Sequence, residues 1–265
     1  MPTLSIAMIA HNEEANVARS LASAAWADEV VFVDCGSTDG TALAARDFKI
    51  KYFARPNSQA VYVNKQFSID QATGDWVFIL DADEEISPAL RAEIRRFIAE
   101  PGGAAAAALP RRNFYFGRWL RRGGKYPDTQ LRLFARGRAK FLPLPVHERL
   151  QVDGPVAALS EPLLHYPYST PADMEKKLAF YSEILCRSYA LKGRSRLFIL
   201  LRPFTRFLSA YIFKLGFLDG AEGLKTAVMD FRNVLASALL YRRRPPQAEP
   251  KDPDASRPFG PAAKN

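Results

Sequence analysis

The first hundred residues alternate between short apolar runs and helix-like segments, and this alternation restricts the fold more than any other feature of the chain. The apolar runs have the length of strands and are almost continuously hydrophobic; they cover residues 4–10, 29–34, 49–54 and 76–81. Helix-like sequence fills the intervals, at residues 13–25, 41–48 and 63–73. Such a pattern predicts an α/β fold with a mostly parallel sheet covered by helices on both faces.

Two of the apolar runs end in an aspartate. Asp34 is the last residue of the second run and Asp81 the last residue of the fourth. In open α/β sheets, ligands bind beyond the carboxyl ends of the strands. We therefore expect both carboxylates at one edge of the sheet, where they mark a ligand site.

The segment that begins at Asp81 is acidic, although the chain as a whole has a net charge of +9. Its sequence, DADEE, brings four carboxylates together, and such close like charges raise each other's pKa unless positive charge lies among them. The carboxylates of Asp81 and Asp83 can share one Mg²⁺ or Mn²⁺ ion, which keeps its other positions for water and phosphate. The alternative is a solvated acidic loop in which Glu84 and Glu85 help to cap the following helix.

A polar turn, CGSTDGT, follows Asp34. A turn of this kind opens a helix and presents backbone N–H groups and a carboxylate to a ribose or a base. An ordinary strand–turn–helix connection, with Ser37 or Asp39 as the helix N-cap, is the alternative. The chain has neither a P-loop nor a GxGxxG motif.

Charge is unevenly distributed along the chain. Residues 1–100 hold 9 Lys and Arg against 15 Asp and Glu, whereas residues 101–265 hold 28 against 13. The acidic part favours a cation site, and the basic part favours phosphates, an anionic membrane surface or nucleic acid. Because no nucleic-acid recognition motif is present, we expect no nucleic-acid partner.

Residues 194–218 are apolar but interrupted by arginines and a lysine. Large apolar side chains recur there at a spacing of three and four residues: Phe198, Leu201, Phe204, Leu208, Tyr211 and Leu215. The pattern predicts a basic amphipathic helix that lies in the interface of an anionic membrane. A helix packed on the protein's own core is the alternative.

Three motifs occur in order along the chain: AHNEE at 10–14, VDCGSTDGT at 33–41 and NKQFSIDQATGDWVFILDADEE at 64–85. Together with the later YPDTQLRLFARG, PVHERL and GFLDGAEGL, they resemble the family 2 glycosyltransferases of GT-A fold, most closely the bacterial lipopolysaccharide core enzymes. The resemblance implies a nucleotide-sugar donor, usually UDP-linked, and a divalent cation, Mg²⁺ or Mn²⁺. The chain carries DADEE where many members have two adjacent aspartates.

The resemblance also implies roles for individual residues. Those expected to hold the nucleotide sugar are Ala10, Glu14, Asp34, Ser37, Lys65, Asp81 and Ala82. The expected metal ligands are Asp81, Asp83 and His147, and His165 has a weaker claim of the same kind. Arg132 is expected to face the acceptor. An inverting transfer needs a general base, for which Glu148 and Asp128 both remain candidates.

The predicted organisation has three parts. A GT-A domain covers residues 1–168, with its nucleotide-sugar half at 1–100 and its acceptor half at 101–168; a helical, membrane-interfacial region covers 169–241, and a disordered, proline-rich tail covers 242–265. With a lipid-linked or oligosaccharide acceptor, we expect the protein at the cytoplasmic face of the bacterial inner membrane, peripheral or monotopic. A nucleotidyltransferase and a non-catalytic, membrane-bound nucleotide-sugar-binding protein are the alternative functions, and the oligomeric state is open.

Overall fold

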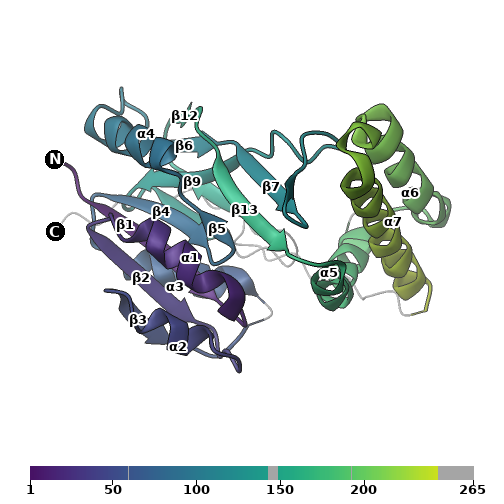
Figure 1. Ribbon diagram of the computed structural model, residues 1–265, viewed down its shortest axis with the longest axis horizontal. Helices are drawn as coiled ribbons and strands as arrows, with labels where there is room; N and C mark the ends of the chain where they lie inside the picture. Colours follow the sequence, from purple (N-terminus) through teal and green to yellow (C-terminus); the bar gives the residue numbers. More distant parts are fainter. Residues whose placement is uncertain (59, 143–148, 192, 244–265) are drawn as a thin grey trace. The chain divides into compact units, whose positions relative to one another are not determined.

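The computed structural model describes residues 1–58, 60–142, 149–191 and 193–243. The chain forms two compact units (Figure 1). The first unit contains the described residues of Met1–Arg111 and Thr129–His165, and the second contains Arg112–Asp128 and the described residues from Tyr166 onward. The domain boundaries expected from the sequence stay a prediction.

A seven-stranded, mostly parallel sheet forms the centre of the first unit (Figure 1). In spatial order its strands are β12 (Val156–Ala158), β6 (Ala106–Leu109), β9 (Gln130–Ala135), β4 (Trp76–Asp81), β1 (Leu4–Ala10), β2 (Glu29–Asp34) and β3 (Lys51–Ala54). Strand β9 runs antiparallel to both of its neighbours, and the other pairs are parallel. The α/β fold and the mostly parallel sheet predicted from the sequence are therefore confirmed.

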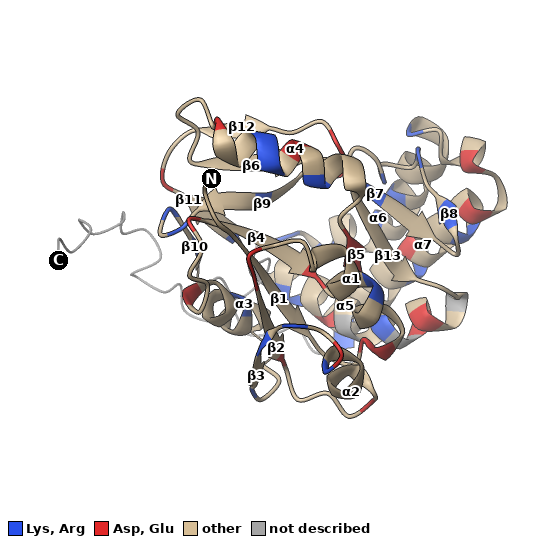
Figure 2. Cartoon of the chain, turned by 60° about the vertical axis from the view of Figure 1, so that its left-hand side comes forward, with Lys and Arg blue, Asp and Glu red and all other residues tan. Residues whose placement is uncertain are grey.

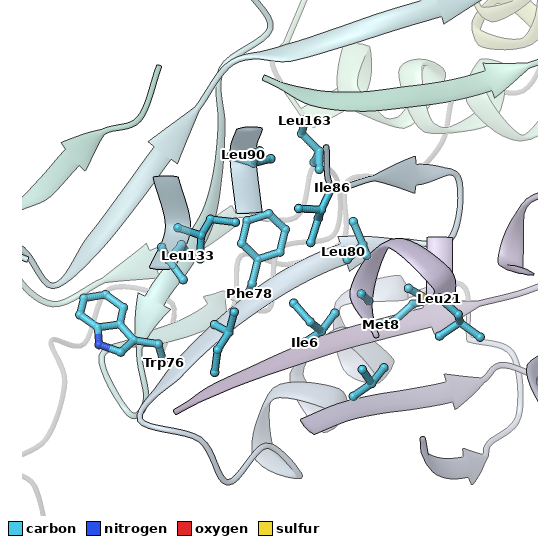
Figure 3. Close-up of a cluster of buried hydrophobic side chains, with 14 of the residues drawn as sticks. Ile6, Met8, Leu21, Trp76, Phe78, Leu80, Ile86, Leu90, Leu133 and Leu163 are labelled. Carbon is cyan, nitrogen blue, oxygen red and sulfur yellow. The ribbon is translucent and has the colours of Figure 1, made fainter. Parts of the chain in front are cut away.

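Side chains of successive strand residues point to opposite faces of this sheet, and both faces are covered. The described helices of the unit are α1 (Glu14–Ala24), α2 (Thr41–Ala45), α3 (Val61–Asp70) and α4 (Pro88–Ala99). On one face, Ile6 and Phe78 belong to a core cluster with buried side chains of α1 and α4 (Figure 3). On the other face, Ala7 and Val77 pack with α3 and with β10 (Ala139–Leu142). Burial on both sides explains why the strands are apolar throughout.

Short strands also form outside the seven-stranded sheet. β10 pairs with β11 (Arg149–Val152), and β5 (Glu84–Glu85) pairs antiparallel with the first residues of β13 (Leu163–Tyr168), so that His165 lies opposite Glu84. Helix α4 follows β5. Pro88 is its first residue, and the N-cap Ser87 accepts a hydrogen bond from the backbone N–H of Leu90 at 3.1 Å.

Helices dominate the second unit. Its described elements include α5 (Pro171–Leu191), α6 (Arg196–Leu208), a π-helical turn (Ser209–Phe213), a 3₁₀ turn (Gly216–Asp219) and α7 (Gly220–Arg243), with β7 (Arg111–Tyr115) paired to β8 (Arg118–Trp119). Both α5 and α6 pack on α7. Among these described helices and those of the first unit, none has the length and apolar character needed to cross a membrane. The tail predicted for 242–265 lies, from residue 244, outside the described residues.

Candidate active site

The carboxyl ends of β2 and β4 lie on either side of β1. Asp34 is in register with Ala10, the last residue of β1, and Asp81 is in register with Ile9. Two carboxylates that are 47 residues apart in the sequence therefore flank the end of one central strand. This is the edge at which open α/β sheets bind ligands, and it is where the strand pattern places the two aspartates.

The Asp34 carboxylate is fixed by its neighbours. It is only 6% exposed, and it accepts hydrogen bonds from the Ser37 N–H and the Tyr52 hydroxyl, both at 3.0 Å. Tyr52 comes from β3, the next strand in the sheet. The turn after β2 is thus organised around this carboxylate, and the nucleotide-sugar roles of Asp34 and Ser37 stay a prediction.

The loop after β1 is hydrogen-bonded to the turn after β2. The Asn12 side chain accepts a hydrogen bond from the Thr38 N–H at 2.8 Å, and the Glu14 carboxylate accepts one from the Gly40 N–H at 3.1 Å. A β-carbon on Gly40 would overlap this carboxylate, so only glycine fits there without a shift of Glu14. Gly40 is also the N-cap of α2, which the sequence pattern wrongly assigned to Ser37 or Asp39.

Basic side chains surround the acidic segment. Arg132 donates from Nη2 to Asp81 Oδ2 and to Glu84 Oε1, at 2.6 Å in each case. Arg111 donates to the same Glu84 oxygen at 2.9 Å, and Lys65 Nζ lies 3.2 Å from Asp81 Oδ1. Within the described chain, three protein cations therefore supply positive charge that the sequence assigned to a metal ion.

Glu84 is the buried centre of this cluster. Its side chain is 0% exposed, and its Oε2 atom accepts a hydrogen bond from the Asp81 N–H at 3.0 Å. The idea of a solvated glutamate that helps to cap the next helix is therefore wrong. A buried carboxylate is stable only when it is paired and hydrogen-bonded, and the two arginines meet that requirement.

The cations also determine the charge state of Asp81. Burial by itself raises the pKa of this carboxyl, but the charges of Arg132 and Lys65 outweigh burial and hold the pKa well below its usual range. Asp81 is therefore ionised at all physiological pH values. Arg132 keeps one more donor: its buried Nε has no hydrogen-bond partner among the described residues.

Asp83 lies next to a histidine. Its Oδ2 atom is 3.4 Å from Nε2 of His165, on β13. A carboxylate beside an imidazole suits Mn²⁺ or Mg²⁺ in its chemistry, although no group of three or more acidic, histidine or cysteine side chains is arranged as a metal site in the described ranges. The residues fit an ion that takes most of its ligands from water and from the diphosphate of a substrate.

The remaining predicted residues have different outcomes. Ala82, directly after Asp81, is buried. Arg132 pairs with Asp81, and the acceptor-facing role expected of this arginine stays a prediction. Asp128 lies in the second unit, where Asn113 Nδ2 donates to its Oδ2 at 3.1 Å and to the Lys125 carbonyl at 2.8 Å. His147 and Glu148 fall outside the described residues.

Sequence reasoning missed Arg111, Tyr52 and the central place of Glu84. Arg111 stands in PRRN, where nothing in the local pattern separates it from a solvated arginine. Glu84 stands in DADEE, where nothing in the local pattern separates it from the other three carboxylates, and its position depends on the pairing of β5 with the distant β13.

A parallel α/β sheet with carboxylates and cations at its carboxyl edge is the architecture of nucleotide-binding enzymes. The family model for glycosyl transferase family 2 matches residues 5–151, more than half of the chain, and the chain belongs to this family.

Known relatives agree with this assignment. The chain is 28% identical over 265 residues to the lipopolysaccharide core biosynthesis glycosyltransferase LpsC of Rhizobium meliloti, covering 95% of this chain and 97% of that protein. An uncharacterized glycosyltransferase of Rickettsia typhi is 39% identical over 101 residues, which are 37% of this chain and only 34% of that protein. Among solved structures, the mannosyltransferase PcManGT of Pyrobaculum calidifontis superimposes with a TM-score of 0.53 at 15% identity, covering 90% of this chain and 86% of that one. This last likeness concerns the fold alone and agrees with the GT-A prediction.

Proposed function

We propose that the protein is an inverting glycosyltransferase that moves a sugar, most simply a hexose from a UDP-hexose, to a saccharide or lipid-linked acceptor of the bacterial cell envelope. One observation carries the proposal: the polar turn around Asp34 and the cationic cluster around Asp81 flank the end of the same strand. This spacing suits a nucleotide whose base and ribose bind on one side and whose diphosphate binds on the other. Membership of glycosyl transferase family 2 supports it.

The donor is proposed to bind across the end of β1. The Asp34 carboxylate binds the nucleoside, since its oxygens can accept from hydroxyls and ring N–H groups while the Ser37 N–H and the Tyr52 hydroxyl hold it in place. Lys65 and the unpartnered Nε of Arg132 offer positive charge to the diphosphate. The mannosyltransferase PcManGT was solved with GDP-Man and Mn²⁺, which supports a nucleotide-sugar donor and a divalent cation in the proposal for this chain.

Asp83 and His165 would hold the divalent cation. A bound cation would stabilise the negative charge of the leaving nucleoside diphosphate. Lys65 and Arg132 would act in the same direction, because both bring positive charge to the carboxyl end of β4, where the diphosphate is proposed to bind.

The transfer is a single displacement. The acceptor hydroxyl oxygen forms a bond to the anomeric carbon from the face opposite the diphosphate, and the bond between that carbon and the diphosphate oxygen breaks. The bonding electron pair leaves with the nucleoside diphosphate, and the hydroxyl proton passes to a carboxylate. Asp128 and Glu148 are the two carboxylates proposed for this proton. No protein nucleophile is needed.

The acceptor is proposed to be a lipopolysaccharide core saccharide, and the place of action the cytoplasmic face of the inner membrane. The name of the Rhizobium meliloti relative, which this chain covers almost from end to end, supports a core acceptor. The excess of Lys and Arg after residue 100 supports an anionic, phosphorylated acceptor of this kind.

The proposal is tested by thermal unfolding with UDP, GDP and ADP, each with and without Mn²⁺. A ligand at about 100 times its dissociation constant stabilises the native state by about 2.7 kcal/mol. We expect one nucleotide to raise Tm in the wild type and Asp34→Ala and Asp83→Ala to reduce the effect, the second only when Mn²⁺ is present. Asp153→Ala, an exposed carboxylate on the same unit, is the matched control. If no nucleotide raises Tm under any condition, the proposed donor site is wrong.

A further inference from the structure

Helix α6 presents an apolar face to the surroundings of the second unit. Five large side chains at positions i, i+3, i+4, i+7 and i+11 fall on one side of the helix, and we name them the α6 outer face: Leu197, Leu200, Leu201, Phe204 and Leu208. All five are exposed, by 47% to 65%. The opposite side of α6 carries the buried Ile199 and Pro203, and α6 packs on α7. Of the outer face, Phe204 also contacts α7, with its ring centre 5.4 Å from that of Phe231, yet it stays 57% exposed.

The apolar surface continues beyond the helix. In the two turns that follow α6, Ile212, Phe213, Phe217 and Leu218 are exposed by 46%, 79%, 43% and 54%. Soluble proteins rarely leave so many neighbouring large apolar side chains in water unless another surface covers them. Three residues of the apolar stripe predicted from the sequence belong to the α6 outer face and are exposed: Leu201, Phe204 and Leu208.

Positive charge accompanies this surface. Residues 194–218 contain five Lys and Arg and no Asp or Glu (Figure 2). Two of these cations, Arg194 and Arg202, lie 4.9 and 5.9 Å from the centre of the Phe198 ring, next to the outer face. Their long side chains can keep an apolar stem against the helix while the charged group reaches outward.

A second basic segment is attached to the same surface. The backbone N–H of Gly123, in the loop RWLRRGGK, donates to the Lys214 carbonyl at 2.9 Å. Asp230 of α7 binds both the loop and α6, because Lys125 Nζ lies 3.1 Å and Arg206 Nη2 2.8 Å from its carboxylate. These contacts connect the loop, with its exposed Arg121 and Arg122, to α6 and to the turn that follows it.

We infer that the α6 outer face, with the cations beside it, is the site by which the protein docks on an anionic lipid bilayer. Apolar side chains enter the boundary between headgroups and acyl chains, and arginines beside them bind lipid phosphates. The inference concerns a partner of the second unit and does not rest on the proposed sugar transfer, although it suits a lipid-linked acceptor.

Other occupants fit the surface less well. A second copy of the chain would bring two sets of cations together, because a two-fold interface apposes the same patch on both partners. The chain's own C-terminal segment, residues 244–265, offers a single large apolar side chain, Phe259, which is too little to cover nine exposed ones.

Vesicle sedimentation of the full chain tests the inference. One set of vesicles contains phosphatidylcholine alone, and the other contains about one third phosphatidylglycerol. We expect binding to the anionic vesicles that weakens as salt is added, and weaker binding to the neutral ones. The double variant Leu200→Glu/Phe204→Glu should lose binding by on the order of tenfold or more, since each buried side chain contributes that much.

The matched control is the double variant Leu43→Glu/Val156→Glu, which alters two exposed apolar residues of the first unit, 68% and 50% exposed. It should bind vesicles like the wild type. Circular dichroism checks that both variants are folded. The inference is overturned if the wild type ignores anionic vesicles, if both double variants lose binding equally, or if light scattering shows a dimer that the α6 variant abolishes. None of these assays contains a sugar nucleotide, so their results do not affect the proposal for the donor site.

Discussion

Replacement of Arg132 by methionine tests whether protein cations stabilise the acidic segment. The substitution keeps an unbranched side chain but removes both 2.6 Å contacts, to Asp81 and to the fully buried Glu84. Loss of one partner of a buried ion pair leaves an uncompensated charge, which costs about 3–5 kcal/mol of unfolding free energy. Arg111 remains on Glu84 at 2.9 Å, so we expect the lower part of this range, about 3 kcal/mol.

Urea denaturation followed by circular dichroism gives the unfolding free energies of the wild type and the variant. Arg138→Met is the matched control, because Arg138 pairs with Asp153 at 3.5 Å on the surface, both side chains being half-exposed, and such pairs contribute about 0–1 kcal/mol. The double variant Arg132→Met/Glu84→Gln should recover part of the loss, since it removes the stranded charge. Equal stability of Arg132→Met and Arg138→Met would refute the reasoning.

Three further predictions concern other parts of the chain. Gly40→Ala should weaken nucleotide binding with a small change in Tm, because its β-carbon displaces the Glu14 carboxylate; calorimetric titration with the stabilising nucleotide measures this. Ser87→Ala should lower the unfolding free energy by about 1 kcal/mol through loss of the α4 cap, and Ser87→Asp should restore it in the same urea assay. Burial raises the pKa of Asp230, but the two cations that contact it lower the pKa below its ordinary value of 3.8. Its stabilising contribution is therefore present above about pH 4 and lost as pH falls further, so Asp230→Asn should flatten the acid side of a plot of Tm against pH.

The sheet edge of the candidate site follows from sequence because it depends on local pattern. Each apolar run forms a strand, two of these strands end in an aspartate, and parallel strands place their carboxyl ends together. Asp34 and Asp81 are therefore found from alternation alone. The roles attached to Glu14, Lys65 and Asp83 rest on the resemblance to family 2 and not on the pattern.

The charge balance of the site does not follow from sequence. The partners of Glu84 are Arg111, 27 residues away, and Arg132, 48 residues away. They lie on β7 and β9, strands of two different sheets whose arrangement the local pattern does not give. The same limit hid β5 and β12, because strands of two or three residues carry no readable alternation. The sequence left two possibilities for the apolar stripe of α6, since an amphipathic pattern is the same whether a core or a membrane covers it.

The central claim is sugar transfer, and product analysis tests it most directly. The purified chain is incubated with Mn²⁺, a panel of nucleotide sugars and truncated lipopolysaccharide core, and the acceptor is weighed by mass spectrometry while nucleoside diphosphate release is followed. The account predicts that one donor adds a single sugar mass to the acceptor, with one nucleoside diphosphate released for each sugar, and that Asp83→Ala slows both. Stable nucleotide binding without any gain in acceptor mass for any donor would contradict it and favour a binding protein; conversion of sugar phosphate and nucleoside triphosphate to nucleotide sugar would instead identify a nucleotidyltransferase.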